Sequence, residues 1–466
     1  MLNITRTITD ITAFGLVTEY LNELSYDMSS CASHSGSTDI SRISADDILF
    51  FDIETTGLSP RDSYLYLIGC MCINEGQAEL TQLFSQNMSE ESMLITGFLR
   101  LLEAHPVLVH FNGSTFDVPF LRSKAAELGI PFPDEIRELD IYQCIKPLKK
   151  LLGLTSMRQK SLEALLGIER RDMYDGGELI DIYLKYIAHL SLDSIGAVPA
   201  SDAGRISCAP PSHINRRITD SFSTASGLRL LGENSADELL EVMLLHNFED
   251  VYNLTCITPL LTLTGLFHGG FRIVPDSTVI NNDSLEISIA VNHAEAAGLI
   301  LRLVLSDSSG RTHSAAQCGS GSEQPVDVSG FFRISCAGVN PFTVTLGKCA
   351  YGLKLTVPLS NCEMKLFLPD YKNYYYLPGE DYCVHKSLGS LLDRSVAVKC
   401  KAADCYSKKT GAFAPVAAKK GGNLNDFIHL YQNSYKDTAR FALAEDLVSN
   451  AEALKEYVLL LLQALL

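Results

Sequence analysis

The sequence predicts a mixed α/β domain over residues 46–268, followed by a β-rich region over residues 269–466 that ends in helices. Two patterns support this division. Between residues 48 and 190, apolar runs of strand length and segments of helical period follow in the order β-β-β-α-β-α-β-α, which is typical of a mixed sheet flanked by helices. Beyond residue 268, short apolar or alternating runs follow one another at close spacing, which is typical of an antiparallel sheet or sandwich.

Periodicity places the elements of the first domain. Strands are expected at 48–53, 65–73, 78–84, 105–112 and 135–142. Helices are expected at 91–104, 116–129, 143–152, 160–168 and 177–190. A longer helical pattern covers 235–261, and Ser235 followed by early acidic residues is the expected N-cap.

The segments outside these patterns differ in composition. Residues 1–45 are predicted to hold one N-terminal helix, at about 11–24, and a Ser-rich linker. Residues 191–233 are rich in Ser, Pro, Ala and Gly, and we expect a disordered surface insertion there. The last forty or so residues are predicted to be helical.

Composition limits the function classes. The chain has 466 residues and a net charge of −17, so nucleic acid could be bound only through local basic patches and not through bulk charge. Thirteen cysteines, at no recognisable zinc spacing, indicate reduced, buried thiols in the cytoplasm. The N-terminus lacks a signal-peptide pattern, and the apolar tail at 457–466 is too short to span a bilayer, so no membrane association is expected.

Two acids at the end of the first predicted strand suggest a metal site. Asp52 and Glu54 follow the apolar run Ile48 to Phe51, and residues two apart on a strand point to the same face. Two like charges leaving a buried strand are costly unless a cation neutralises them. Hard divalent cations such as Mg²⁺ prefer the oxygen ligands that carboxylates supply.

Three further residues complete a set suited to phosphodiester hydrolysis. Asp117 lies just after the fourth strand, at the start of a helix, whereas His246 and Asp250 are four residues apart and share one face of the long helix. Such hydrolysis uses two divalent ions held by three or four carboxylates. It also needs a general base, and histidine suits that role near neutral pH.

These motifs resemble those of the DEDD exonucleases of the ribonuclease H-like superfold, in particular the YprB-type branch, over about residues 46–260. The first family motif is D-x-E followed by T-T-G, and the second is an Asn, a short gap, an aromatic residue and Asp. The third is His or Tyr shortly before Asp, here in the H-N-x-x-D form of the YprB-type branch. The commonest His form has one more residue between His and Asp, and the spacing found here equals that of the Tyr form.

The resemblance implies a ribonuclease H-like mixed sheet flanked by helices and a 3′–5′ exonuclease that hydrolyses DNA or RNA from a single-stranded end. It implies a role in DNA repair or nucleic-acid processing. If the fold instead served mainly as a binding module, the β-rich C-terminal region could recruit a partner such as a helicase. Two ions, Mg²⁺ or Mn²⁺, would be held by Asp52, Glu54, Asp117 and Asp250, with His246 as the base. The expected substrate contacts are Thr55, Thr56, Gly57, Leu58, Asn112 and Phe116.

Other interpretations remain open at this point. The fold could serve as a non-catalytic module that binds nucleic acid or a partner, or as a structure-specific endonuclease. Asp140 could support the site or pair with Arg137, and Asp172 beside Arg170 favours a solvated salt bridge. In the C-terminal region, lysines between 399 and 420 lie near a run of tyrosines, which fits either a grip on single strands or a solvated surface over packed tyrosines.

Overall fold

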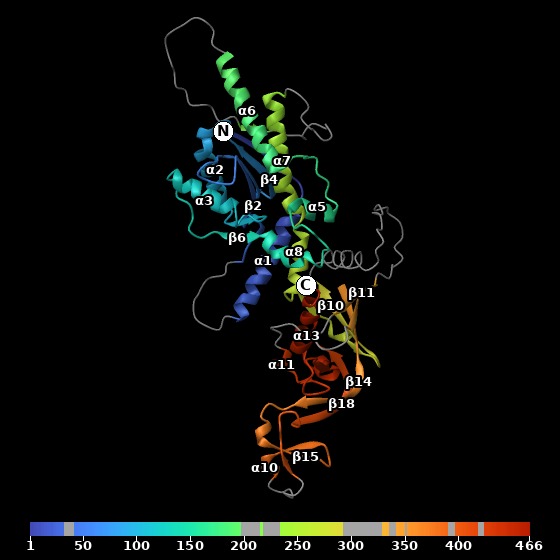
Figure 1. Ribbon diagram of the computed structural model, residues 1–466. Coiled ribbons are helices and arrows are strands. Elements are labelled where there is room, and N and C mark those ends of the chain that lie inside the picture. The colour runs from blue at the N-terminus through green and yellow to red at the C-terminus, as the bar shows by residue number, and fades with distance from the viewer. Residues whose placement is uncertain are drawn as a thin grey trace, which may run out of the picture. The chain divides into compact units, whose positions relative to one another are not determined.

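The computed structural model describes residues 1–31, 42–196, 215–217, 234–291, 329–334, 342–349, 352–389, 397–417 and 424–466. The chain divides into two compact units (Figure 1). The first contains Met1–Lys149 and Leu154–Thr262, and the second contains Lys150–Gly153 and Leu263–Leu466.

The first unit is built on a seven-stranded mixed sheet in the order β6-β5-β2-β3-β4-β1-β7. Strands β5 and β6 run parallel to the central strand β2, whereas β3 and β4 continue the sheet antiparallel to it. This confirms the predicted α/β class with a ribonuclease H-like sheet. The strands are β1 (Leu2–Ile8), β2 (Ile48–Thr55), β3 (Leu65–Asn74), β4 (Gln77–Phe84), β5 (Val107–His110), β6 (Arg137–Asp140) and β7 (Asn215–Arg217).

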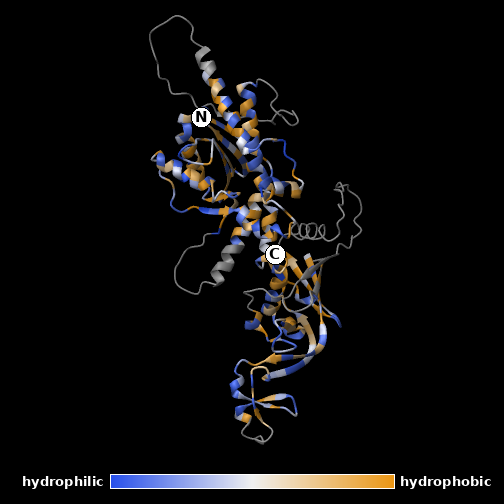
Figure 2. Cartoon of the chain, viewed as in Figure 1, coloured by the Kyte–Doolittle hydropathy of each residue, from blue (hydrophilic) through white to orange (hydrophobic). Residues whose placement is uncertain are grey.

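Helices cover both faces of this sheet (Figure 1). Helices α2 (Glu91–Ala104) and α3 (Asp117–Glu127) pack on one face, and α1 (Thr12–Cys31), α6 (Gly176–Gly196) and α7 (Ala236–Cys256) pack on the other. The unit also contains α4 (Ile141–Ile145) and α5 (Gln159–Leu166), whereas α8 (Pro259–Phe267) begins in this unit and ends in the second. Ser235 caps α7 in a reciprocal capping box with Glu238, as the sequence predicts. Figure 2 shows that α6 and α7 carry hydrophobic and hydrophilic residues in alternating bands, as expected of helices with one face on a sheet.

Successive side chains along β2 point to opposite faces of the sheet. Phe51 and Ile53 belong to the core cluster that contains the buried side chains of α2 and α3. Phe50 faces the other way and meets Phe14 of α1 edge to face at 5.0 Å. Asp52 and Glu54 share the parity of Phe50, so both carboxylates project toward the face covered by α1 and α7.

Gly69 on β3 allows α7 to lie very close to the sheet. In the register of the sheet, Gly69 is opposite Asp52 on one side and Gln82 on the other. A Cβ atom at Gly69 would lie 2.3 Å from Oδ1 of Asn247 and 2.8 Å from Cγ2 of Val251, both on α7. Any side chain there would therefore push the helix away from β2.

The N-terminal segment and the 191–233 segment contribute strands that the sequence analysis does not anticipate. β1 pairs antiparallel with β4, and β7 pairs parallel with β1. Helix α1 includes the predicted 11–24 helix and continues to Cys31, while α6 extends to Gly196. The remainder of the Ser-rich linker and of the 191–233 segment lies outside the described residues.

The second unit is β-rich, as predicted, and its described strands are antiparallel. One sheet has the order β11-β12-β13-β10-β8 with β9 beside β10, another is β14-β18-β20-β19, and a small one is β16-β15-β17. The bounds are β8 (Phe271–Ile273), β9 (Val279–Ile280), β10 (Ser284–Val291), β11 (Ser329–Ile334), β12 (Phe342–Cys349), β13 (Gly352–Pro358), β14 (Ser360–Phe367), β15 (Tyr374–Leu377), β16 (Tyr382–His385), β17 (Val398–Lys399), β18 (Tyr406–Pro415), β19 (Leu430–Tyr431) and β20 (Phe441–Leu443). The expected strand at 299–306 lies outside the described residues.

The end of the chain is only partly helical. Helices α10 (Lys386–Gly389), α11 (Leu424–Phe427), α12 (Ala444–Ser449) and α13 (Ala451–Gln463) occur in this unit, and strands β19 and β20 lie between α11 and α12. The predicted terminal helices correspond to α12 and α13, and the sequence analysis misses the two short strands β19 and β20, which complete the sheet around β18. Across the described ranges, no helix combines the length and apolar character that crossing a membrane requires.

The tyrosines near the lysine-rich segment are engaged within the unit. The hydroxyl groups of Tyr376 and Tyr406 both donate to Asp381, which also pairs with Lys408 at 2.5 Å. Lys365 lies over the Tyr406 ring at 3.9 Å. These contacts favour the interpretation of packed tyrosines beneath a lysine surface over that of open stacking platforms.

We predict that Gly69→Ala destabilises the first unit by about 1–3 kcal/mol, the usual cost of overpacking a closely packed contact. The measurement is urea-dependent hydrogen exchange of the β3 amides, which reports on this unit even when the two units unfold separately. Gly15→Ala in α1 is the control, because nothing lies within 4 Å of a Cβ added there. Equal effects of the two substitutions would contradict the proposed close approach of α7.

Candidate active site

Asp52 and Glu54 stand where the central strand β2 meets α7. Oδ2 of Asp52 accepts a hydrogen bond from Nδ2 of Asn247 at 3.3 Å. Oδ1 of Asn247 accepts in turn from Nε2 of Gln82 at 3.0 Å. Asn247 and Gln82 are both fully buried. This chain of hydrogen bonds therefore holds the Asp52 carboxylate against α7.

Asp117 is brought to the same edge by the turn after β5. It is the first residue of α3, and the turn before it places Asn112 at a φ of +62°. The backbone N–H of Asn112 donates to Oδ1 of Asp140 at 2.8 Å, so Asp140 supports this turn. A Cβ at Gly113 would lie 3.0 Å from Oδ2 of Asp117 and 2.8 Å from Cγ of His110, so only glycine fits beneath the carboxylate.

Helix α7 supplies His246 and Asp250 on one face. Nε2 of His246 is 3.0 Å from Oδ2 of Asp250 and 3.5 Å from Oε1 of Glu54. One ligand atom from each of these three residues lies within 4.8 Å of the other two. Residues from β2 and α7, almost two hundred positions apart in the chain, therefore meet in one cluster.

Asp172 is buried behind His246 and pairs with Arg170 at 3.4 Å, so the expected salt bridge forms but is buried rather than solvated. Its Oδ2 is 2.8 Å from Nδ1 of His246, and only 9% of the residue is exposed. The backbone N–H of Tyr174 donates to Oδ1 of Asp172 at 3.0 Å, and Nζ of Lys160 lies 3.1 Å from Oδ2. The imidazole therefore has one nitrogen on a fixed carboxylate and the other facing Glu54 and Asp250.

Arg170 neutralises part of the acidic cluster. Its guanidinium contacts Oδ1 of Asp250 and binds Glu163 through Nε at 2.5 Å. Glu249 of α7 accepts backbone hydrogen bonds from Arg171 and Asp172 at 3.0 and 2.9 Å. These contacts hold the loop after α5 against α7 and fix the positions of Arg170 and Asp172.

The charges in the cluster are unequally compensated. Burial, together with the charge of Asp250, raises the pKa of Asp52 well above its ordinary value. Burial likewise raises the pKa values of Glu54 and Asp117 to about 7. Burial would also raise the pKa of Asp250, but His246 and Arg170 outweigh it and hold that pKa well below its usual range.

His246 has the opposite balance. Burial tends to lower its pKa, but the carboxylates of Asp250 and Asp172 outweigh burial and raise it well above the ordinary value. In the described part of the chain, no Lys or Arg side chain forms an ion pair with Asp52 or Asp117. This site accordingly has a deficit of positive charge.

The donor set fits hard divalent cations. Asp52, Glu54, Asp117 and Asp250 offer carboxylate oxygens from three different elements and interact electrostatically with one another. Carboxylate oxygens are the ligands that Mg²⁺ and Mn²⁺ prefer, and such ions would offset the repulsion among the acids. These four residues are therefore the ones that could hold metal ions.

The predicted substrate contacts border this cluster on two turns. After β2, the Thr55 hydroxyl donates to the Gly57 carbonyl at 2.9 Å, and the Thr56 hydroxyl accepts from the Tyr64 N–H at 2.8 Å. A Cβ at Gly57 would lie 2.6 Å from Oγ of Ser63, so a larger residue there would displace the Ser63 hydroxyl. Leu58, the next residue, is 83% exposed, whereas Phe116 is half-buried and packs on Phe120 with ring centroids 5.6 Å apart.

Several residues of this site escape sequence reasoning. Asn247 could have been proposed from its position alone. It directly follows His246 on the helix that is expected to pack against the strand carrying Asp52 and Glu54. Asp172 and Arg170 in the loop after α5, and Glu163 on α5, carry no such signal, because charged residues usually face solvent.

Known protein families and sequences resemble parts of this chain. A family model described as RNase_H superfamily matches residues 49–195. "DNA polymerase 1" of Saccharolobus solfataricus (strain ATCC 35092 / DSM 1617 / JCM 11322 / P2) is 34% identical over 64 residues, which are 14% of this chain and 7% of that polymerase. The match thus spans a small fraction of the polymerase.

Two solved structures show a fainter likeness. The family B DNA polymerase from the archaeon Pyrobaculum calidifontis has a TM-score of 0.30 at 12% identity, covering 71% of this chain and 36% of that chain. "Exonuclease I (apo)" has a TM-score of 0.21 at 14% identity, covering 32% and 46% respectively. The family match, together with the strand order, assigns the first unit a ribonuclease H-like fold.

We predict that Glu54→Gln stabilises the metal-free protein at alkaline pH. Because burial raises the pKa of Glu54 from 4.5 to about 7, the folded state binds more protons than the unfolded state in that window. The free energy of unfolding therefore falls as pH rises from about 4.5 to about 7. Glutamine cannot ionise, so the variant should gain about 1–3 kcal/mol at pH ~8 and little at pH ~4.

The measurement is hydrogen exchange of the β2 amides in the presence of a chelator at both pH values. Glu103→Gln, an exposed acid on α2, is the matched control and should change neither value. A loss of stability for Glu54→Gln at alkaline pH would show that Glu54 is already compensated within the protein.

Proposed function

We propose that this chain is a metal-dependent exonuclease that hydrolyses phosphodiester bonds of DNA or RNA from a single-stranded 3′ end. We further propose that it belongs to the YprB-type branch of the DEDD exonucleases and acts in DNA repair or nucleic-acid processing. The observation that supports this proposal most is the meeting of Glu54 and Asp250 with His246, whose far nitrogen faces Asp172. Asp52 and Asp117 interact electrostatically with the same carboxylates.

In this proposal Asp52, Glu54, Asp117 and Asp250 hold two divalent ions, Mg²⁺ or Mn²⁺. When bound, such ions supply Lewis-acid activation of water and offset charge at the departing oxygen. The residues of the chain do the remaining work. Asn247 orients Asp52, and Arg170 keeps Asp250 ionised.

His246 is the proposed general base. Its Nδ1 faces the Asp172 carboxylate at 2.8 Å, so Nε2 is the nitrogen that would accept a proton from water. The carboxylates raise the pKa of His246 in the metal-free site, and bound cations that neutralise Glu54 and Asp250 would lower it again. Nε2 also faces Glu54 and Asp250, where the proposal places the attacking water. Asp172 acts through His246 by fixing its ring orientation, as carboxylate partners of catalytic histidines do.

Leu58 and Phe116 are the proposed contacts for the terminal nucleotide. A leucine that is 83% exposed beside an acidic cluster has little structural reason to be there, and it offers an apolar surface to a base. The turns that carry Thr55 to Gly57 and Asn112 would approach the sugar and phosphate through the backbone. Because the whole chain carries a charge of −17, binding would depend on the metal ions rather than on bulk charge.

Asp52→Asn and Asp250→Asn should each reduce cleavage to background, because each removes a ligand charge. The assay uses DNA and RNA oligonucleotides labelled at either end, with Mg²⁺ or Mn²⁺, and a covalently closed single strand. An exonuclease releases mononucleotides from linear strands and spares the closed one.

Asp181→Asn, an exposed acid on α6, is the matched control and should retain full activity. Full activity of Asp52→Asn would refute the metal-ligand role. Cleavage of the closed strand would favour the endonuclease alternative, and absence of cleavage with every substrate would favour a binding module.

Asp172→Asn should lower kcat by about 10–100-fold, the usual effect of removing a group that orients a catalytic histidine, and leave KM little changed. The substitution should also shift the acidic limb of the pH–rate profile to lower pH, because the carboxylate no longer stabilises the imidazolium. His246→Ala should cost about 10²–10⁴-fold.

Glu169→Gln, an exposed acid in the same loop, serves as the control for Asp172→Asn. An Asp172→Asn enzyme with reduced kcat and an unmoved pH profile would mean that Asp172 only holds the loop.

A further inference from the structure

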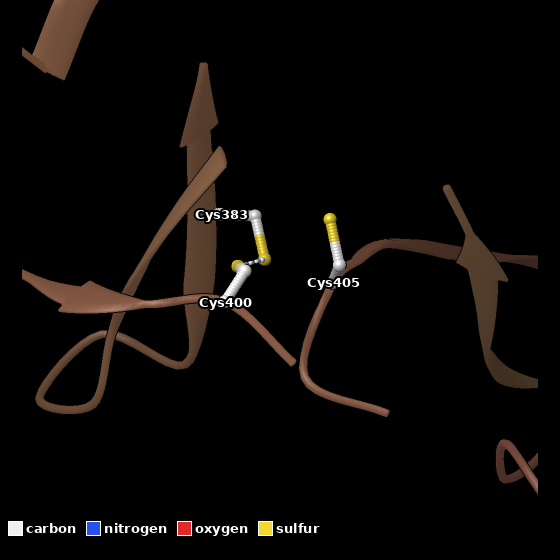
Figure 3. Close-up of side chains that lie close together, drawn as sticks. All are labelled: Cys383, Cys400 and Cys405. Carbon is white, nitrogen blue, oxygen red and sulfur yellow. Dashed lines mark hydrogen bonds between the residues drawn. The ribbon is translucent and has the colours of Figure 1, made fainter. Parts of the chain in front are cut away.

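Three cysteines of the second unit meet in one buried cluster far from the carboxylates in sequence. Cys383 lies on β16, Cys400 directly follows β17, and Cys405 directly precedes β18. One sulfur from each lies within 4.8 Å of the other two, and all three residues are buried. In Figure 3 the side chains of Cys383 and Cys400 point toward each other, with the two sulfurs 3.7 Å apart.

We propose that Cys383, Cys400 and Cys405 bind one thiophilic divalent ion, with Zn²⁺ as the probe, and that this ion ties the small β16-β15-β17 sheet to the start of β18. Neither the family match nor the proposed nuclease activity requires such a site, because the RNase_H match ends at residue 195.

The sulfur spacing fits a tetrahedral thiolate site. With a Zn–S bond of about 2.3 Å, two thiolates of a tetrahedron lie about 3.8 Å apart. The sulfurs of Cys383 and Cys400 are already 3.7 Å apart. A small rotation of the Cys405 side chain would bring its sulfur to a similar distance from the other two. Cys400 and Cys405 are separated by four residues, which is the upper limit of the usual spacing of paired zinc ligands, so the expectation that no cysteines are at a zinc spacing needs correction here. The third cysteine, Cys383, comes from a neighbouring strand.

The small sheet has only a small apolar core among its described residues. Its strands β15 and β16 have four residues each and β17 has two. The buried members of its core cluster are the three cysteines alone, with partly buried Leu368, Tyr371, Tyr374 and Tyr376 around them. A sheet of this size rarely buries enough apolar surface by itself, and small scaffolds of this kind are commonly held by a metal or a disulfide.

A metal ion would bind all three cysteines of the cluster, whereas a disulfide would join only two. A disulfide requires sulfurs about 2.05 Å apart and would leave the third buried thiol unexplained. Three thiolates around a divalent ion leave one negative charge, and exposed Lys399 and Lys401 flank Cys400 in the chain. Among the described residues, no fourth Cys, His, Asp or Glu joins the group, so a water or an added ligand would complete the tetrahedron.

The experiment is an anaerobic titration of the full, reduced chain with Co²⁺, followed by displacement with Zn²⁺. We expect one Co²⁺ per chain to give a thiolate-to-metal charge-transfer band and intense tetrahedral d–d bands, both lost on addition of Zn²⁺. Carboxylate ligands at the candidate active site give no thiolate band, so the signal is specific to the cysteines. Chelation should also lower the hydrogen-exchange protection of the β15 and β16 amides.

Cys383→Ser, Cys400→Ser and Cys405→Ser should each abolish the thiolate band. Cys362→Ser is the matched control, because Cys362 is a free thiol on β14 of the same unit and lies outside the cluster. Where a variant fails to fold, removal and return of Zn²⁺ in the unmodified chain tests the proposal instead, through the loss and recovery of hydrogen-exchange protection of the β15 and β16 amides. Absence of the band in the reduced, folded chain would overturn the proposal, as would a Cys383–Cys400 disulfide that forms in air and leaves no metal binding after reduction.

Discussion

Gly69 lets α7 approach the sheet closely enough for its side chains to reach the acids of the central strand. Asn247 occupies the space above this glycine and bonds to both Asp52 and Gln82. The same helix carries His246 and Asp250 on either side of that contact. A single close approach of backbone and helix thus determines whether residues from distant parts of the chain form one site.

Charge is the second constraint on this site. Arg170 and His246 compensate Asp250, whereas Asp52 and Asp117 have no such partner in the described residues. Burying uncompensated carboxylates costs stability, and proteins retain such arrangements chiefly where they serve binding or catalysis. Divalent ions would relieve the same repulsion that makes the metal-free site unfavourable.

Local patterns account for much of what the sequence could predict. The apolar runs at 48–53 and 65–73 place β2 and β3, the Ser235 cap places the start of α7, and the i, i+2 spacing puts Asp52 and Glu54 on one face. Contacts between distant segments were not predictable in this way. The pairing of β1 with β4, the burial of Asp172 behind His246 and the meeting of the three cysteines depend on tertiary packing, which leaves no periodic signal.

In the proposed mechanism, Asp52, Glu54, Asp117 and Asp250 share two ions. Electron paramagnetic resonance during a Mn²⁺ titration tests this sharing most directly, because two ions bridged at about 3.5–4 Å are magnetically coupled. We expect two Mn²⁺ per chain with a coupled spectrum that Asp250→Asn abolishes. Isolated, uncoupled Mn²⁺ at saturation, or a spectrum unchanged by Asp250→Asn, would contradict it.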